Sequence, residues 1–308
     1  MIAAVIDLGT NTFHLIVARF SPSGMEILHK RNEPVKLGEG RLNDNIIIPE
    51  AFERGLHALE SFSKDIKAYR PTIVKACATS AVRNAENGPD FIKAAKDRSG
   101  IHIDVITGDQ EAEYIFEGVK GSGTIQDKSL IMDIGGGSTE FIICKKDELL
   151  WKQSFDIGAA RLMQAFFHSD PISHTEIQSI NTHLDQVLKP LFEACKQHKP
   201  QHLIGSAGAF ETFSTMILQE PIGSKSIKSG KLDLKKYRNL SSILIMSTHQ
   251  EREQMSGLIP LRVDMIVIAS LLTDYIIDHL DITSLSLSTF DLKMGVLHSL
   301  KAHGTASL

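Results

Sequence analysis

Cysteine is scarce in this sequence, with three residues among 308, and no two of them stand in a CxxC spacing. An odd and scattered set of thiols argues against a disulfide framework and against a zinc site. We therefore predict three buried thiols: Cys77, Cys144 and Cys195.

Long apolar runs are also missing. The most apolar helical stretch, 263–277, contains Asp264 and Asp274 and is too short and too polar to span a bilayer. No basic segment and no small-residue cleavage site precede the first strand pattern, so we expect no signal peptide and a cytoplasmic protein.

Neither charge nor aromatic content indicates binding to nucleic acid. The net charge is −4, and a single tryptophan with four scattered tyrosines makes no stacking platform for single strands. We expect no nucleic acid and no membrane as a partner, and an anionic ligand would need a local site.

Strand-like and helix-like stretches alternate along the first half of the chain, which is typical of an α/β fold. Helices are predicted from Pro49, near 90–96 and from Asp109. Apolar and β-branched residues predict strands over 3–7, 12–20, 25–37, 73–78 and 102–107.

The second half has the same α/β character. Strands are predicted over 130–134, 141–145, 149–155 and 202–205, and helices over 176–198, 234–248 and 262–280. A Gly/Ser/Thr/Gln stretch at 121–128 has the composition of a linker, so we predict two domains, 1–122 and 123–290.

An internal echo links the two halves. Residues 5–12 read VIDLGTNT and residues 132–139 read MDIGGGST, each an apolar strand, an aspartate and a small polar turn that leads into another apolar strand. Such a repeat predicts two similar domains that face each other across a cleft.

Both turns suit a phosphate chain. Glycine allows close approach to an anion, successive N–H groups form an anion-binding nest, and the aspartate offers a hard oxygen for Mg²⁺. A single copy would read equally well as an Asx-turn in a hairpin, whereas two copies favour a phosphate clamp. P-loop and Rossmann signatures are absent from the sequence.

Four motifs in this order resemble the exopolyphosphatase and guanosine pentaphosphate phosphohydrolase family, which belongs to the superfamily of actin, the heat-shock chaperone ATPases and the sugar kinases. They are VIDLGTNTFHL at 5–15, TSAVR at 79–83, ITGDQEA at 106–112 and MDIGGGSTE at 132–140. Less specific matches at 35–40, 156–162, 204–208, 262–264 and 291–297 extend the resemblance over essentially the whole chain.

The resemblance implies a fold of two duplicated actin-like, or ribonuclease H-like, domains with a cleft between them. It implies the short, two-domain form found in bacteria, because longer members carry a C-terminal helical extension. The superfamily topology further implies that the last helix, at about 291–303, joins the first domain.

The activity implied is Mg²⁺-dependent removal of the terminal phosphate from polyphosphate or from guanosine pentaphosphate (pppGpp). On this resemblance Glu111 is the general base that activates water, as a carboxylate in a cleft can do. The alternative is a first-turn acid that complements the helix dipole, which Asp109 could also be.

The implied metal ligands are Asp133 and Glu140, with Asp7 as an additional ligand, directly or through water. His14 stands in the first echo where Glu140 stands in the second, so the second turn is the more acidic. Ordinary surface carboxylates are the alternative.

The implied phosphate-binding residues come from both turns and from the TSAVR motif, whose arginine offers a guanidinium fork. Arg83 could instead only end a helix or lie at the surface. The full set is Thr10, Asn11, Arg83, Gly135, Gly136, Gly137, Ser138 and Thr139.

Some interpretations stay open on the sequence. The Gly205–Gly208 loop departs from the family pattern and favours a simple strand-to-helix turn, and the basic segment 225–238 favours a solvated face over a polyanion track. A kinase of the same superfamily and a non-catalytic polyphosphate- or nucleotide-binding protein remain alternatives. A homodimer is possible through the long helices of the second half.

Overall fold

The structure is a computed structural model that describes residues 1–22, 24–219 and 229–305, with side chains described as far as Lys301. Two compact units make up the chain. Unit 1 contains residues 1–118 and the C-terminal residues from Leu292 on, and unit 2 contains Val119–Asp291. Among the helices described, none is both long and apolar enough to cross a membrane.

Unit 1 is built on a five-stranded sheet in the order β3-β2-β1-β4-β5. The first three strands form an antiparallel meander, and β4 and β5 continue the sheet in parallel. The strands are β1 (Ile2–Leu8), β2 (Phe13–Ser21), β3 (Gly24–Glu33), β4 (Ile73–Ala78) and β5 (Ile103–Val105).

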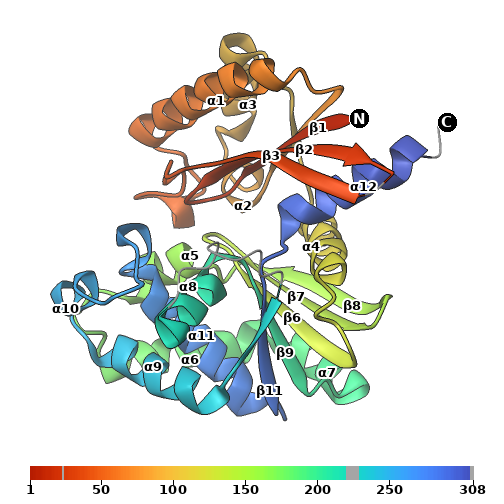
Figure 1. The fold of residues 1–308 in the computed structure, drawn as a ribbon. Coiled ribbons are helices and arrows are strands. Elements are labelled where there is room, and N and C mark those ends of the chain that lie inside the picture. Colours follow the sequence, from red (N-terminus) through yellow and green to blue (C-terminus); the bar gives the residue numbers. More distant parts are fainter. Residues whose placement is uncertain (23, 220–228, 306–308) are drawn as a thin grey trace. The chain divides into compact units, whose positions relative to one another are not determined.

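Helices pack on the sheet of unit 1 (Figure 1). The helix α1 begins at Pro49, as its sequence predicts, and buries one face that includes Leu56, Leu59 and Phe62 against the sheet and α3. The last helix packs on β1, and its Gly295 also lets the Tyr114 carbonyl of α4 approach closely. The helices are α1 (Pro49–Tyr69), α2 (Ser80–Arg83), α3 (Gly88–Ser99), the first part of α4 (Gly108–Ser122) and α12 (Leu292–Thr305).

Unit 2 repeats this plan. Its six-stranded sheet has the order β10-β11-β9-β6-β7-β8, in which β6, β7 and β8 form an antiparallel meander and β9 and β11 add in parallel. The strands are β6 (Lys128–Ile134), β7 (Thr139–Lys145), β8 (Glu148–Phe155), β9 (His202–Ser206), β10 (Ser229–Leu232) and β11 (Ser284–Ser288). The duplication predicted from the two echoes is therefore confirmed, with β10 added at one edge.

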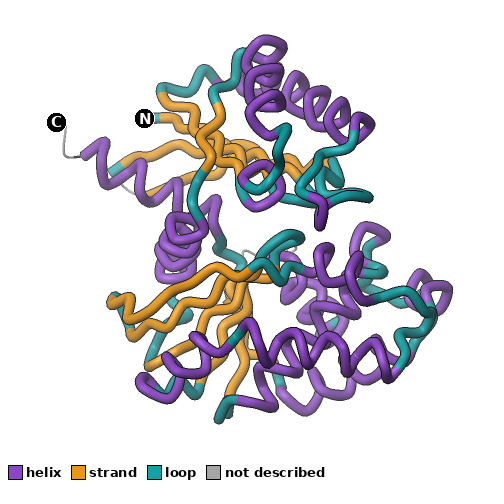
Figure 2. The backbone as a smooth tube through the Cα atoms, turned by 180° about the vertical axis from the view of Figure 1, so that it is seen from behind, coloured by secondary structure: helices purple, strands orange, loops and turns teal. Residues whose placement is uncertain are grey.

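A larger set of helices covers the sheet of unit 2, and the tube view shows each sheet packed with helices (Figure 2). The helix α11 is buried almost all round, which accounts for its apolar sequence. The helices are α5 (Ala159–Phe166), α6 (His174–Val187), α7 (Lys189–His198), α8 (Ala207–Leu218), α9 (Leu234–Met246), α10 (His249–Glu253) and α11 (Met265–His279).

Several predicted boundaries were wrong, chiefly because of proline. The third strand ends at Glu33 rather than at Leu37, since Pro34 lacks an N–H for the ladder. The helix predicted over 176–198 is two helices, because Pro190 lies in the first turn of α7. The elements α2, α5, α8, α10, β10 and β11 were not predicted.

The thiols are buried, as predicted. Cys77, Cys144 and Cys195 are free and buried, and desolvation raises the pKa of each from 9.0 to about 12. They stay protonated and unreactive near neutral pH.

Candidate active site

The glycine-rich turn of unit 2 joins β6 to β7 and is braced by the start of α5. The Gly135 amide closes the turn by donating to the Ser138 carbonyl at 3.0 Å. All three glycine carbonyls then accept hydrogen bonds from α5 and the residue before it: Gly135 from Ala159 at 2.9 Å, Gly136 from Ala160 at 2.9 Å and Gly137 from Gly158 at 3.3 Å.

This bracing leaves the turn amides available to a ligand. Within the described part of the chain, no acceptor takes the N–H of Gly136 or Gly137. A Cβ at Gly158 would lie 2.4 Å from the Gly136 carbonyl carbon and oxygen, so the turn sits directly on that glycine. The Thr139 hydroxyl donates to the Ile157 carbonyl at 3.1 Å and ties the turn to the same segment.

Two carboxylates lie beside this turn on one face of the sheet. Asp133 and Glu140 are directly opposite each other across β6 and β7, and both are buried, at 7% and 1% exposure. Glu140 is opposite Ser154 of β8 in turn, and the Ser154 hydroxyl donates to the Glu140 carboxylate at 2.6 Å. The carboxylate pair is therefore fixed by strand register and by a neighbouring hydroxyl.

Unit 1 repeats the arrangement with different side chains. Asp7 of β1 is opposite His14 of β2, and a His14 ring nitrogen is hydrogen-bonded to the Asn32 amide oxygen at 2.7 Å. In the β1–β2 turn, the Thr10 carbonyl accepts from the Gly38 amide at 3.0 Å. Both turns are thus held by the segment that follows the third strand of their unit. At the corresponding positions unit 2 pairs two carboxylates, whereas unit 1 pairs an aspartate with a histidine.

The Gly38 position shows how tightly the first turn is held. A Cβ there would lie 2.4 Å from the Thr10 side chain. The Asn11 carbonyl of the same turn accepts from the Lys36 amide at 2.8 Å. Thr10 is itself buried, so the turn has little freedom to move.

Arg83 and Glu111, which are far apart in the sequence, meet in unit 1. One guanidinium nitrogen of Arg83 donates to the Glu111 carboxylate at 2.9 Å and to the Ile106 carbonyl at 3.0 Å. The side chains are only 18% and 10% exposed, so the ion pair is largely shielded from solvent.

Glu111 is not needed to cap its helix. Thr107 and Gln110 form a reciprocal pair at the start of α4: the Thr107 amide donates to the Gln110 side chain at 2.9 Å, and the Gln110 amide donates to the Thr107 hydroxyl at 3.2 Å. Asp109 is exposed in the same turn and can complement the helix dipole. Capping of α4 therefore does not account for the burial of Glu111.

Burial sets the proton affinity of Glu111. Desolvation raises the pKa of this carboxyl above its ordinary 4.5, and the Arg83 charge and hydrogen bond offset only part of the rise. A carboxylate with a raised pKa is a better proton acceptor once it is ionised, which suits a general base.

The two segments left open on the sequence have different outcomes. The Gly205–Gly208 loop is the turn from β9 into α8. Of the basic segment, Lys225 and Lys228 lie outside the described residues, and Arg238 forms ion pairs with Asp274, at 2.9 Å, and Asp278.

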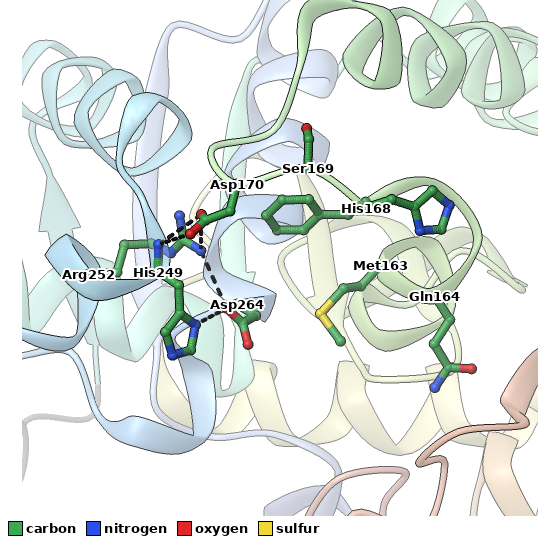
Figure 3. A pocket seen from close by; sticks show the side chains of 9 residues that line it. Met163, Gln164, His168, Ser169, Asp170, His249, Arg252 and Asp264 are labelled. Atoms are coloured by element: carbon green, nitrogen blue, oxygen red, sulfur yellow. Dashed lines mark hydrogen bonds and ion pairs between the residues drawn. The ribbon is translucent and has the colours of Figure 1, made fainter.

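A pocket of about 380 Å³ in unit 2 was not predicted (Figure 3). One wall comes from the end of α5, with Met163 and Phe167. The other carries charges: a His249 ring nitrogen lies 2.6 Å from the Asp264 carboxylate, and buried Arg252 lies 3.3 Å from the same carboxylate. His249 and Asp264 are too far apart in sequence for a local pattern to have indicated this pair.

Comparison with known proteins agrees with this architecture. The profile of the Ppx/GppA phosphatase family matches residues 16–303. The crystal structure of an exopolyphosphatase from Cytophaga hutchinsonii is similar, with a TM-score of 0.93, 36% identity and 97% of each chain covered. A Haemophilus influenzae protein provisionally named as an exopolyphosphatase is 28% identical, covering 97% of this chain and 91% of that protein.

An Aquifex aeolicus member of the Ppx/GppA family shares the fold, with a TM-score of 0.81, 24% identity, and 99% of this chain and 98% of that chain covered. The two duplicated α/β units are thus actin-like, as the resemblance implied. With its family profile, its structural relative and its paired turns in agreement, the chain belongs to the Ppx/GppA phosphatase family.

Proposed function

We propose that this protein hydrolyses the terminal phosphoanhydride bond of inorganic polyphosphate, and that it also accepts guanosine pentaphosphate. Family membership and a relative named as an exopolyphosphatase support the reaction class. Both substrates end in the same phosphoanhydride, so one set of residues serves either. The proposal depends chiefly on Glu111. Its carboxylate is buried, its pKa is raised, and it is not needed to cap α4.

In the reaction, a water molecule attacks the terminal phosphorus and the bond to the bridging oxygen breaks. Glu111 accepts the proton of the attacking water, and inorganic phosphate leaves together with a chain shorter by one unit. Arg83 orients Glu111 through their 2.9 Å ion pair, and its remaining N–H groups face developing charge on phosphate oxygens.

The turns hold the phosphate chain. The amides of Gly136 and Gly137, whose carbonyls are taken by α5, donate to phosphate oxygens in the manner of an anion nest. In unit 1 the carbonyls of Thr10 and Asn11 accept from the Gly38 and Lys36 amides, and this turn has the same role. Because these donors are fixed before the substrate arrives, they need no rearrangement when charge develops.

The donor set of unit 2 fits Mg²⁺. Asp133 and Glu140 offer two buried carboxylates in register, and Mg²⁺ in proteins commonly takes one or two carboxylates and completes its shell with water and substrate phosphates. No group of three or more His, Cys, Asp or Glu side chains placed to hold a metal occurs in the described residues, so this carboxylate pair would leave the rest of the shell to water and substrate. Mg²⁺ held by Asp133 and Glu140 would offset charge on the phosphoryl oxygens.

The test is phosphate release from medium-length polyphosphate and from guanosine pentaphosphate, each with Mg²⁺ or with a chelator. Asp133→Asn is compared with Asp281→Asn, an exposed aspartate elsewhere in unit 2. We expect Mg²⁺-dependent release by the parent and by Asp281→Asn, and on the order of 10²-fold or slower release by Asp133→Asn.

Release from polyphosphate alone would restrict the proposal to that substrate. No release from either substrate would refute the hydrolase assignment. Release that Asp133→Asn retains at the parent rate would refute the metal assignment.

A further inference from the structure

The hydroxyl of Ser206, the last residue of β9, has no hydrogen-bond partner in the described part of the chain, although the residue is fully buried. Ser206 occupies the N-cap position of α8 in an extended conformation, yet its side chain does not cap the helix. Buried polar atoms without partners are rare and unfavourable, so this hydroxyl needs an explanation.

The strand register places Ser206 next to a proposed metal ligand. In the parallel ladder of β6 and β9 it is directly opposite Asp133, and on its other side it is opposite Ser288 of β11. Opposed residues on neighbouring strands project from the same face, about 5 Å apart. The Ser288 hydroxyl already donates to the Phe290 carbonyl at 2.8 Å, which leaves Asp133 as the polar neighbour of interest.

A row of four polar residues therefore crosses the sheet: Ser206, Asp133, Glu140 and Ser154. One hydroxyl flanks each end of the carboxylate pair. At one end Ser154 donates to Glu140 at 2.6 Å. At the other end the Ser206 hydroxyl donates to nothing among the described residues. A hydrogen-bond acceptor beside Asp133 would satisfy it.

The backbone on both sides of Ser206 is closely packed, which restricts the position of that hydroxyl. A Cβ at Gly205 would lie 2.0 Å from the Phe210 ring, and one at Gly208 would lie 2.0 Å from the Arg262 guanidinium. Ala207 has a φ of 64°, a left-handed conformation that is unfavourable for alanine. The backbone therefore holds Ser206 in its extended, non-capping conformation.

We propose that Ser206 is a positioning residue whose hydroxyl donates a hydrogen bond to the hydration shell of the cation held by Asp133. Mg²⁺ keeps several waters when it binds to one or two carboxylates, and such a water supplies the missing acceptor. The inference rests on the metal assignment of the proposed function. It adds a residue to the site from the loop that the sequence favoured as a simple turn.

The experiment measures Mn²⁺ binding, by the loss of the free-ion electron paramagnetic resonance signal, and thermal stability in the same samples. The parent is compared with Ser206→Ala, with Asp133→Asn and with Ser270→Ala. Ser270 is the matched control, because its hydroxyl is also buried and has no partner in the described residues, but it lies on α11.

We expect Ser206→Ala to bind Mn²⁺ about 10-fold more weakly, as for other groups that orient a metal shell. Its melting temperature should equal or exceed that of the parent, since the variant loses an unsatisfied hydroxyl. Ser270→Ala should bind Mn²⁺ as the parent does. If Ser206→Ala does not fold, Ser206→Cys, with a similar volume and a weaker donor, should show the same loss of affinity.

Parent affinity in a folded Ser206 variant would overturn the role of Ser206 while leaving the metal site intact. A loss of affinity that only accompanies a lower melting temperature would also overturn it. If the parent binds no Mn²⁺, or if Asp133→Asn binds it as well as the parent does, the metal assignment fails. The role of Ser206 then fails with it.

Discussion

Replacing Gly158 by alanine should disable the second phosphate turn without replacing any carboxylate. The added Cβ would lie 2.4 Å from the carbonyl carbon and oxygen of Gly136 and 2.5 Å from the Gly137 carbonyl carbon. Carbon atoms in contact prefer separations of about 3.5–4.0 Å, so the turn would have to shift by roughly 1 Å. These neighbours are backbone atoms, so no side chain can rotate away to relieve the overlap.

The expected effect has two parts. Overpacking of this kind typically lowers the free energy of unfolding by about 1–3 kcal/mol. A misplacement of about 1 Å in groups that position a substrate can lower kcat/KM by about 10²-fold. Urea unfolding followed by circular dichroism measures the first part, and phosphate release from polyphosphate measures the second.

Gly230→Ala is the matched control. A Cβ at this position of β10 meets no atom of the described residues within 4 Å, and the backbone is not in the left-handed region. We expect it to change the free energy of unfolding by less than about 0.5 kcal/mol and to leave kcat/KM unchanged. A folded Gly158→Ala protein with the kcat/KM of the parent would refute the reasoning that the turn holds phosphate.

Two further predictions concern pH. Arg83→Gln removes the positive charge that partly offsets the effect of burial on the pKa of Glu111, so this pKa should rise further. The acidic limb of kcat/KM against pH should then move to higher pH. An unmoved limb would contradict the role of Glu111 as the base. His249 has its pKa raised above 6.5 by its hydrogen bond to Asp264, so the stability that it adds is fully present below pH 6.5 and is lost as pH rises through its folded pKa. Urea midpoints at pH 5.5 and 8.5 should therefore fall more for the parent than for His249→Gln, and equal falls would show that this pair does not contribute.

Much of the fold could be predicted because local patterns carry it. The two strand-and-turn echoes predicted the duplicated sheets, and Pro49 predicted the start of α1. Pro34 and Pro190 were visible in the sequence as signals that interrupt a strand and a helix. The predictions gave more weight to the apolar pattern around them. Once proline's missing N–H is weighed first, both boundaries follow.

The site was less predictable because long-range pairing assembles it. Arg83 and Glu111 were each identified by motif, but nothing local indicates their ion pair. The parallel pairing of β9 with β6 brings Ser206 beside Asp133, and no local pattern indicates it. The absence of a partner for its hydroxyl in the described residues follows from the close packing around it. The pocket beside Phe167 combines α5 with residues far along the chain.

The central claim is that Glu111 is the base, and one comparison tests it most directly. Phosphate release from polyphosphate is measured at saturating Mg²⁺ for the parent, for Glu111→Gln and for Asp109→Asn, which changes an exposed acid in the same helical turn. We predict that Glu111→Gln loses about 10²- to 10⁴-fold in rate while Asp109→Asn keeps the parent rate. If both variants keep the parent rate, or if both lose the same modest amount, Glu111 is only a first-turn acid and the account is wrong.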